Sequence, residues 1–375
     1  MGALDDRLDR EGSIRFDEFV DLVLYGPDGF YAVGGGAGRS GGDFLTSPEV
    51  GPLFGAVVAR YLDHTWERLG RPDEFVVVEA GAGRGALALA VLAAGPDCAD
   101  SLRYVLVERS PALRARQSEH LSLAEPFVVL NGPREADPDA ADAPPPAPRG
   151  PFVVSLPDLP AEPVTGVVLA NELLDNLAFR VLERTSSGWS ELRVTRSGSR
   201  LVELLVPADE SAASHAAAIA PQAPVGARVP LQDRAVEWLR DAFEVLDRGA
   251  VLLFDYAARS TAGLAVRPWT EWLRTYVGHG RGGGPLDDPG RQDVTVEVAV
   301  DQLAALRRPD VDLSQTEWLR RWGLDELVDA GRQLWEQRAG VGDLAALRAR
   351  SRVAEAEALT DPAGLGAFRA LEWHR

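Results

Sequence analysis

Glycines at alternate positions and two acidic residues mark the part of the chain best suited to hold a small molecule. Gly81, Gly83 and Gly85 separate two apolar stretches, Glu79 precedes them, and Glu108 ends the next apolar run. Glycines let the backbone turn sharply close to a ligand, and the start of a following helix offers free N–H groups. A carboxylate at the end of the next strand is placed to accept ribose hydroxyls. The pattern predicts a turn that binds a nucleoside.

The spacing of these glycines favours one nucleoside cofactor over another. They read Gly-x-Gly-x-Gly, whereas the dinucleotide fingerprint is Gly-x-Gly-x-x-Gly around a diphosphate. S-adenosyl-L-methionine (SAM) has no diphosphate, and Glu79 suits its ammonium group. We therefore predict SAM, with Glu79 at its amino end, Glu108 on the ribose, and close backbone approach at Gly81, Gly83 and Gly85. An NAD or nucleotide-sugar enzyme is the weaker alternative.

A second polar group follows a later apolar run. Asn171, Glu172 and Asp175 come directly after residues 166–170, and ligands of open α/β sheets bind beyond the carboxyl ends of the strands. A carboxylate there can hold a guanidinium through two hydrogen bonds and take its proton as a methyl group arrives. In the alternative interpretation, Asp175 caps a turn and Asn171 bonds to the backbone. We predict an acceptor role for Asn171 and Glu172, and leave Asp175 open between the two.

Several apolar runs predict the sheet that would bring these groups together. Residues 75–78 and 103–107 are typical of strands buried on both faces, and 86–94 predicts the helix between them. Residues 166–170 and 249–255 predict further strands, and 368–373 an antiparallel last strand. The glycines and the acidic residues would then share one edge of a parallel sheet.

Two more segments are candidates for contact with the cofactor. The glycine-rich stretch 34–42 leads to Ser47, Pro48 and Glu49, which are typical of a helix start. A mobile loop of this kind suits a lid, with Thr46 and Ser47 near the methionine end, although a plain surface loop would have the same composition. Asp158 follows the predicted strand at 152–155, where a residue near the adenine is expected; a surface role is the alternative.

Four motifs, in order along the chain, resemble those of the MidA/NDUFAF7 family of class I SAM-dependent methyltransferases: Gly42-Asp-Phe-Leu-Thr-Ser-Pro-Glu-Val50, Val78-Glu-Ala-Gly-Ala-Gly-Arg-Gly85, Leu106-Val-Glu-Arg-Ser-Pro111 and Ala170-Asn-Glu-Leu-Leu-Asp175. The family usually has proline at position 82 and aromatic residues at 173 and 174. The resemblance implies a protein arginine methyltransferase whose partner belongs to the respiratory chain or its assembly, with Asn171 and Glu172 clamping the acceptor.

The resemblance and the predicted strands give one fold class. We expect an α/β, Rossmann-like doubly wound sheet with an antiparallel last strand, plus an N-terminal helical and lid segment and an inserted β-hairpin. The predicted boundaries are 1–70 for the N-terminal helices and lid and 71–375 for the methyltransferase domain. Insertions are expected at 131–151, 179–230 and 263–295.

The composition limits the kinds of partner and cofactor that the chain is expected to bind. A formal net charge of −18 argues against binding to a nucleic-acid backbone. The single cysteine, Cys98, excludes a disulfide within the chain, and five histidines without ligand spacing predict no metal site. No apolar stretch approaches the ~20 residues of a membrane span, and no targeting signal is evident. We expect a cytoplasmic protein that does not insert into membranes. The sequence is compatible with a homodimer.

Two alternative functions share the predicted fold. A small-molecule O- or N-methyltransferase would keep the SAM turn but enclose its acceptor in a pocket. A non-catalytic assembly factor would retain the fold as a scaffold and would not bind SAM.

Overall fold

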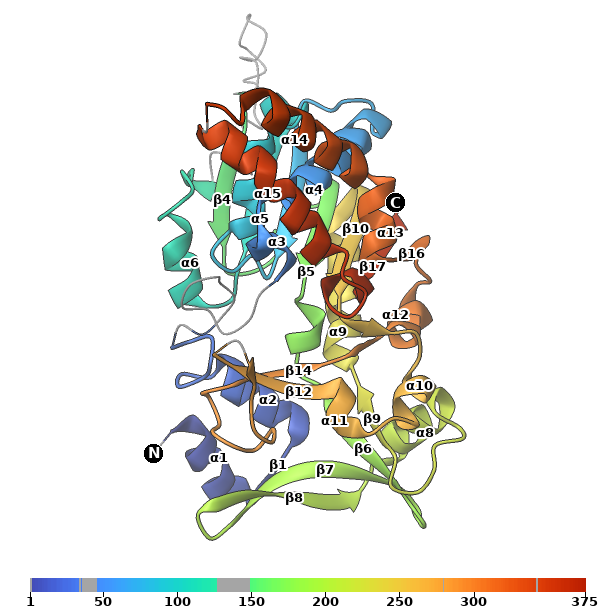
Figure 1. Ribbon diagram of the computed structural model, residues 1–375. Coiled ribbons are helices and arrows are strands. Elements are labelled where there is room, and N and C mark those ends of the chain that lie inside the picture. The colour runs from blue at the N-terminus through green and yellow to red at the C-terminus, as the bar shows by residue number, and fades with distance from the viewer. Residues whose placement is uncertain (1, 34, 36–45, 127–148, 279, 342) are drawn as a thin grey trace, which may run out of the picture. The chain divides into compact units, whose positions relative to one another are not determined.

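The computed structural model describes residues 2–33, 35, 46–126, 149–278, 280–341 and 343–375 (Figure 1). The chain folds into two compact units, each built from three segments. We call residues 46–171, 242–254 and 310–375 the sheet unit, and residues 1–45, 172–241 and 255–309 the hairpin unit. Most of the predicted glycine-rich lid, most of the loop at 131–151, and His279 lie outside the described residues.

A seven-stranded sheet forms the centre of the sheet unit. Its strand order is β16-β17-β10-β5-β2-β3-β4. Strands β10, β5, β2, β3 and β4 pair in parallel, and β17 runs antiparallel to β16. Gly249 and Arg375 exchange reciprocal backbone hydrogen bonds of 2.9 Å, the pattern of an antiparallel pair between β10 and the end of β17. The strands are β2 (Phe75–Ala80), β3 (Leu102–Val107), β4 (Phe152–Leu156), β5 (Val164–Asn171), β10 (Leu246–Asp255), β16 (Val311–Ser314) and β17 (Arg369–His374).

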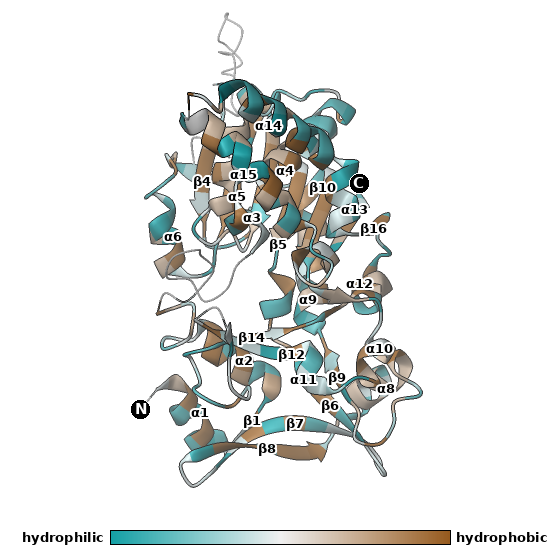
Figure 2. Ribbon diagram, in the orientation of Figure 1, coloured by the Kyte–Doolittle hydropathy of each residue, from teal (hydrophilic) through white to brown (hydrophobic). Residues whose placement is uncertain are grey.

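This arrangement confirms the predicted fold class. The strands are buried because their residues are almost continuously apolar, as the hydrophobic colouring of the sheet in Figure 2 shows. The long parallel part ends in an antiparallel strand, as expected for a class I methyltransferase.

Several helices of the sheet unit, among them α4, α5 and α13, pack on one face of the sheet and form the main core with it. Phe254 of β10 lies edge-on to Phe54 of α4, with ring centroids 5.1 Å apart, and edge-on to Trp318 of α13 at 4.7 Å. Such aromatic pairs stabilise a core beyond the area they bury. The helices of this unit are α3 (Ser47–Val50), α4 (Pro52–Arg68), α5 (Ala86–Ala94), α6 (Pro111–Gln117), α13 (Gln315–Arg321), α14 (Leu324–Arg338) and α15 (Leu344–Leu359), with 3-10 turns η1 (Ala99–Ser101) and η3 (Leu365–Ala367).

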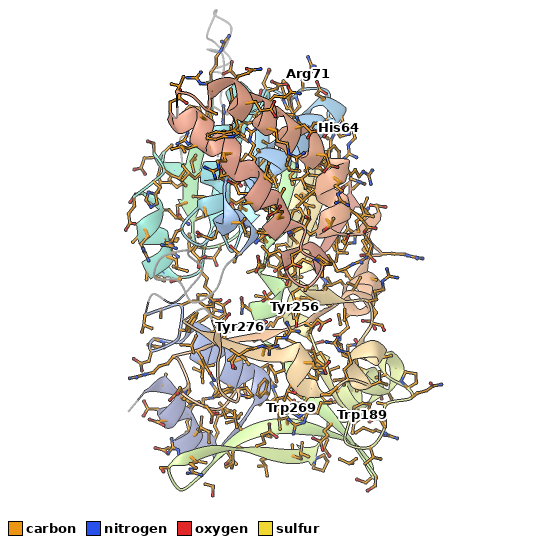
Figure 3. The ribbon with its side chains drawn as sticks, in the orientation of Figure 1. His64, Arg71, Trp189, Tyr256, Trp269 and Tyr276 are labelled. Carbon is orange, nitrogen blue, oxygen red and sulfur yellow. The ribbon has the colours of Figure 1, made fainter. Side chains whose placement is uncertain are left out.

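The hairpin unit contains the predicted inserted strands. Its five-stranded sheet has the order β1-β7-β6-β9, and β8 pairs with β7 outside this path. Strands β6, β7 and β8 form an antiparallel meander. The guanidinium of Arg184 stacks on Trp189, and that of Arg228 stacks on Trp269; both tryptophans are labelled in Figure 3. The strands are β1 (Ser13–Arg15), β6 (Arg180–Thr185), β7 (Gly188–Ser197), β8 (Arg200–Pro207), β9 (Arg228–Leu231), β11 (Ala257–Ala258), β12 (Leu273–Val277), β13 (Gly280–Arg281), β14 (Asp293–Val296) and β15 (Val298–Ala299).

The helices of the hairpin unit are short apart from α2 and α8. They are α1 (Ala3–Glu11), α2 (Phe16–Tyr25), the 3-10 turn η2 (Leu174–Asn176), α8 (Glu210–Ile219), α10 (Thr261–Ala265), α11 (Trp269–Trp272) and α12 (Val300–Leu306). Helix α9 (Asp233–Val245) begins in this unit and ends in the sheet unit.

The structure divides the chain differently from the predicted boundaries. The units separate near residue 45 instead of residue 70, and the chain passes between them again near residues 171, 241, 254 and 309. The helix expected from Ser47 to about residue 69 is interrupted at Gly51 and restarts at Pro52. The segment 263–295, predicted as an insertion, contains β12 and β14 paired in register.

One buried carboxylate connects α15 to the start of α4. Glu355 is 5% exposed, and its Oε2 accepts a 2.9 Å hydrogen bond from the N–H of Leu53, which has no partner within its own helix turn. Ser351 donates a 2.6 Å bond to the other oxygen. Glu355→Ala should therefore lower the free energy of unfolding in urea by about 1–3 kcal/mol, because a buried donor loses its acceptor. The exposed neighbour Glu357 is the control, and an equal loss in Glu357→Ala would contradict this role.

Candidate functional site

The glycine turn after β2 has the backbone that its sequence predicts. Gly81, Gly83 and Gly85 have φ values of 70°, 53° and 81°, in the left-handed region that favours glycine. A Cβ atom on Gly85 would come within 2.6 Å of Leu121 Cδ1, so this glycine is needed for packing. A Cβ atom on Gly83 would meet nothing within 4 Å. Gly83 thus presents bare backbone to open space, as a ligand-binding turn requires.

Glu108 is held directly against this turn. Its Oε2 accepts a 2.9 Å hydrogen bond from the Gly83 N–H, and its Oε1 accepts a 2.7 Å bond from the Ser110 N–H. Burial raises the pKa of Glu108, while these two backbone donors act to lower it. Each carboxylate oxygen can accept more than one hydrogen bond. The side chain is therefore fixed in place with acceptor capacity left for the two hydroxyls of a ribose.

Glu79 has a different environment, although it also lies at a strand end. It is 5% exposed, and its Oε2 accepts a 2.7 Å bond from the hydroxyl of Tyr104 on β3. Burial raises the pKa of Glu79 to about 8, partly offset by hydrogen bonds from Tyr104 and from the Ala88 N–H. The carboxyl is thus largely protonated at neutral pH. Its contact with the amino end of SAM stays a prediction.

Gln117 holds the turn from the opposite side, and sequence reasoning missed it. This residue of α6 is fully buried; its Nε2 donates a 2.9 Å bond to the Gly83 carbonyl, and its Oε1 accepts a 2.5 Å bond from Ser155 of β4. One side chain therefore links the glycine turn, α6 and the end of β4. Only the polarity of Gln117 on an otherwise half-apolar helix could have suggested this.

The other residues predicted to bind the cofactor are placed as follows. Ser47 is fully buried and donates a 2.9 Å bond to Gln315, while Thr46 is 9% exposed and immediately precedes α3. Asp158 is exposed just beyond β4. A 3.7 Å ion pair between Glu49 of α3 and Arg84 connects the helix start to the glycine turn. Cofactor contact remains a prediction for Thr46, Ser47 and Asp158.

The predicted acceptor residues begin at the edge of the same sheet. In β5, Ala170 pairs with Ala80 of β2, so Asn171 is level with the first residue of the glycine turn. Glu172 follows it in the chain with φ of 53°, a left-handed value that is uncommon for a residue other than glycine. Asn171 is half-buried at the end of the sheet unit, and Glu172 starts a segment of the hairpin unit.

Asp175 belongs to a buried polar group inside the hairpin unit. Burial and the neighbouring carboxylates of Asp255 and Asp293 raise the pKa of Asp175, and Thr295 donates a hydrogen bond to it. Asp293 Oδ1 accepts a 3.0 Å bond from Asn176 and lies 3.2 Å from the hydroxyl of Tyr31. The strand predicted at 249–255 ends at Asp255, whereas no pattern in the sequence indicated Asp293, Asn176 or Tyr31, which are far apart in the chain.

Tyr256 directly follows β10 and is held by both its hydroxyl and its ring. Its hydroxyl donates a 3.2 Å bond to the Glu271 carbonyl, and the Arg274 guanidinium lies 4.1 Å from its ring centroid, near the Tyr256 label in Figure 3. Within the residues that the structure describes, no group of three or more His, Cys, Asp or Glu side chains could hold a metal ion. The described helices include none with the length and apolarity of a membrane span.

Comparison with known proteins identifies the family. Residues 57–315 match the family described as "Putative S-adenosyl-L-methionine-dependent methyltransferase". A crystal structure from Burkholderia thailandensis with bound S-adenosyl-homocysteine is 27% identical, covers all of this chain and 91% of its own, and has a TM-score of 0.77. A native crystal structure from the same organism is 26% identical, with a TM-score of 0.76 and coverage of 100% and 90%.

The chain belongs to this family and is a class I SAM-dependent methyltransferase, which confirms the predicted enzyme class and cofactor. Relatives in mouse and fruit fly are both named protein arginine methyltransferase NDUFAF7 or its homolog, mitochondrial, and both are 27% identical. The match covers 84% of this chain and 72% of the mouse protein, and 76% of this chain and 65% of the fly protein. These relatives confirm the resemblance drawn from the four motifs.

The predicted cytoplasmic location is contradicted by the same comparison. The mouse, fly and zebrafish relatives are named as mitochondrial proteins and point to that compartment instead. The prediction relied on finding no targeting signal, and a missing signal does not specify a compartment.

Gly83 offers a direct test of the turn. Gly83→Ala should weaken SAM binding by about tenfold or more, ~1.4 kcal/mol, because a Cβ atom would fill space next to the cofactor. The matched control is Gly95, which ends α5 at its other end, also has left-handed φ (67°), and has no atom within 4 Å of an added Cβ. Both alanine variants should lose about 1–2 kcal/mol of stability through backbone strain. Calorimetric SAM affinities that fall equally in both variants would rule out this role.

The pKa of Glu79 predicts a pH dependence of stability. Because folding raises this pKa from 4.5 to about 8, the stability that Glu79 contributes is complete below pH 4.5 and is lost as pH rises through about 8. Glu79→Gln cannot ionise, so its free energy of unfolding relative to wild type should increase by up to about 1.4 kcal/mol per pH unit across that window. Urea titrations between these pH values measure the difference. Glu74→Gln, which changes an exposed side chain, is the control. A stability difference between Glu79→Gln and wild type that stays constant with pH would refute the raised pKa of Glu79.

Proposed function

We propose that this enzyme transfers the methyl group of SAM to an arginine side chain of a protein. The observation that carries the proposal is the position of Asn171. The strand β5 brings it level with the glycine turn, and the carboxylates of Glu172 and Asp175 follow within four residues of the chain. Carboxylates in this position suit a cationic, planar acceptor.

The cofactor half of the site uses groups that are already fixed. Glu108 is oriented by two backbone N–H groups to accept from the ribose, and the backbone around Gly81, Gly83 and Gly85 is shaped for close approach. We extend the cofactor site to Glu79, Thr46, Ser47 and Asp158, whose positions border the same strand ends or the start of α3. Ser47 and Glu79 retain acceptor capacity beside their present hydrogen bonds, because a hydroxyl oxygen and each carboxylate oxygen can accept further bonds.

Methyl transfer to a guanidinium requires that the acceptor nitrogen be aligned with the methyl carbon and that a group accept the released proton. Bound SAM would supply a methyl group on a sulfonium: the acceptor nitrogen would bond to the methyl carbon in line as the C–S bond breaks, with S-adenosyl-homocysteine as the leaving group. The amide of Asn171 and the carboxylate of Glu172 would hold the guanidinium N–H groups, so that one nitrogen faces the methyl carbon. The proton released as the N–C bond forms would pass to a carboxylate, with Glu172 or Asp175 as the acceptor.

The relatives support the choice of acceptor. The mouse and fly proteins carry the name protein arginine methyltransferase, which supports a protein substrate for this chain and, more specifically, an arginine side chain. We extend the proposal to a protein partner of the respiratory chain or its assembly, as the family resemblance implies. The hairpin unit buries the carboxyl groups of Asp175, Asp255 and Asp293 together, and burial raises the pKa values of Asp175 and Asp255.

Two variants separate the roles of the carboxylates. Glu108→Ala should weaken SAM binding by about tenfold or more, since it removes a charge-assisted acceptor. Glu172→Ala should leave SAM affinity within about twofold and reduce methyl transfer by about a hundredfold, in the range of a lost acid–base group. Calorimetry measures the binding. Transfer of tritium from labelled SAM into proteins of a strain lacking the gene measures turnover.

The chemical form of the label tests the acceptor class. After acid hydrolysis, the tritium should be found in methylarginine. Label confined to lysine, to carboxyl esters or to small molecules would contradict the proposal and favour another methyl acceptor. Equal loss of SAM affinity in Glu108→Ala and Glu172→Ala would contradict the division of roles.

A further inference from the structure

Glu172 has a strained backbone at the point where the acceptor segment begins. Among the described residues, only Arg71, Glu172 and Asp288 have positive φ without being glycine. A residue in the left-handed region costs about 1–3 kcal/mol and persists only where its surroundings enforce it. The neighbours of Glu172 within the hairpin unit must therefore supply the constraint.

The carboxylate of Asp255 provides that constraint. Asp255 is 4% exposed, and its Oδ2 accepts a 2.9 Å hydrogen bond from the Leu174 N–H. Its Oδ1 accepts a 2.9 Å bond from the Tyr256 N–H, and the backbone N–H groups of Leu173 and Asp175 act to lower the pKa of Asp255. The bond from Leu174 ties the turn that begins at Glu172 to the end of β10 and so restrains the dihedral angles of that turn.

This arrangement is also electrostatically costly, which indicates a purpose other than stability. Burial and the charge of Glu172 oppose ionisation of Asp255, and Asp175 is a further carboxylate nearby. A turn needs no buried carboxylate if a serine or backbone carbonyl can cap it. The acidic side chains gathered around residues 172–175 favour a cation in this place.

We infer that Asp255 is the positioning residue of the acceptor segment. By accepting the Leu174 N–H, it holds the turn that begins at Glu172 in its left-handed conformation and so fixes where the Glu172 carboxylate meets a cationic acceptor. The inference rests on the proposed function of Glu172, because Asp255 acts on the acceptor only through that residue.

The test replaces Asp255 with its amide and measures the backbone directly. In Asp255→Asn an NH2 donor replaces one of the two oxygens that accept from the Leu174 and Tyr256 N–H groups, and the charge is removed, so hydrogen exchange at residues 173–175 should accelerate by about tenfold or more. The value of kcat for transfer from tritiated SAM to the peptide acetyl-Gly-Gly-Arg-Gly-Gly-amide should fall about tenfold, with the Kd of SAM within about twofold. Asp255→Glu, which retains the charge but moves it, should bind SAM normally and also transfer slowly.

Asp301 provides a matched control in the same unit. Its carboxylate accepts 3.0 Å bonds from the N–H and hydroxyl of Thr261 and so also holds a turn. Asp301→Asn should accelerate exchange at residue 261 without changing exchange at 173–175 or the rate of transfer. If it slows transfer as much as Asp255→Asn, the effect is general destabilisation and the inference fails.

The remaining outcomes are also decisive. Unchanged exchange at 173–175 in Asp255→Asn, or faster exchange with unchanged kcat, overturns the inference. If Asp255→Asn does not fold, Asp255→Glu decides by the same measurements. If wild-type enzyme labels no arginine peptide or protein, the proposed function fails; faster exchange at 173–175 in Asp255→Asn would then still support the structural part of the inference.

Discussion

The cofactor site depends on how one peptide unit is fixed at the end of β2. The N–H of Gly83 donates to Glu108, and its carbonyl accepts from Gln117, so both hydrogen-bonding groups of this glycine are used by neighbouring elements. The left-handed φ of the residue is then determined from two sides. The start of α5 and the ends of β3 and β4 are positioned by the same bonds, which is why the turn can leave open space beside it.

The two glutamates at adjacent strand ends, Glu79 and Glu108, have different hydrogen-bond donors and are therefore suited to different roles. Both side chains are buried, but Glu108 accepts from the backbone N–H groups of Gly83 and Ser110, whereas Glu79 accepts from the hydroxyl of Tyr104. Hydrogen bonds from backbone donors favour the ionised form, and burial favours the neutral form. The first carboxylate is suited to bind hydroxyl groups, and the second to hold a proton that a cationic ligand would displace.

The sequence predicted those parts of the fold whose residues form an unbroken apolar run or a regular spacing of glycines. Continuous apolar runs revealed β2, β3, β5 and β10, and the alternating glycines revealed the turn. The pattern failed for β12 and β14, because Thr275 and Thr295 are polar and become buried only by pairing and packing. It also failed for Gln117, Asp293 and Tyr31, whose partners are distant in the chain. The division into two units was not visible, because each unit is assembled from three separated segments, while local patterns report only neighbouring residues.

The position of β17 has a consequence for how the protein is made. This strand pairs with β16 and, at its end, with β10, so the edge of the parallel sheet is completed by the last of the seven strands to leave the ribosome. Until then β10, with its nearly unbroken apolar sequence, exposes unpaired backbone groups along one side. Such an edge recruits other chains readily. A chain that lacks β17 would therefore expose an apolar strand edge, and such a product is prone to aggregate.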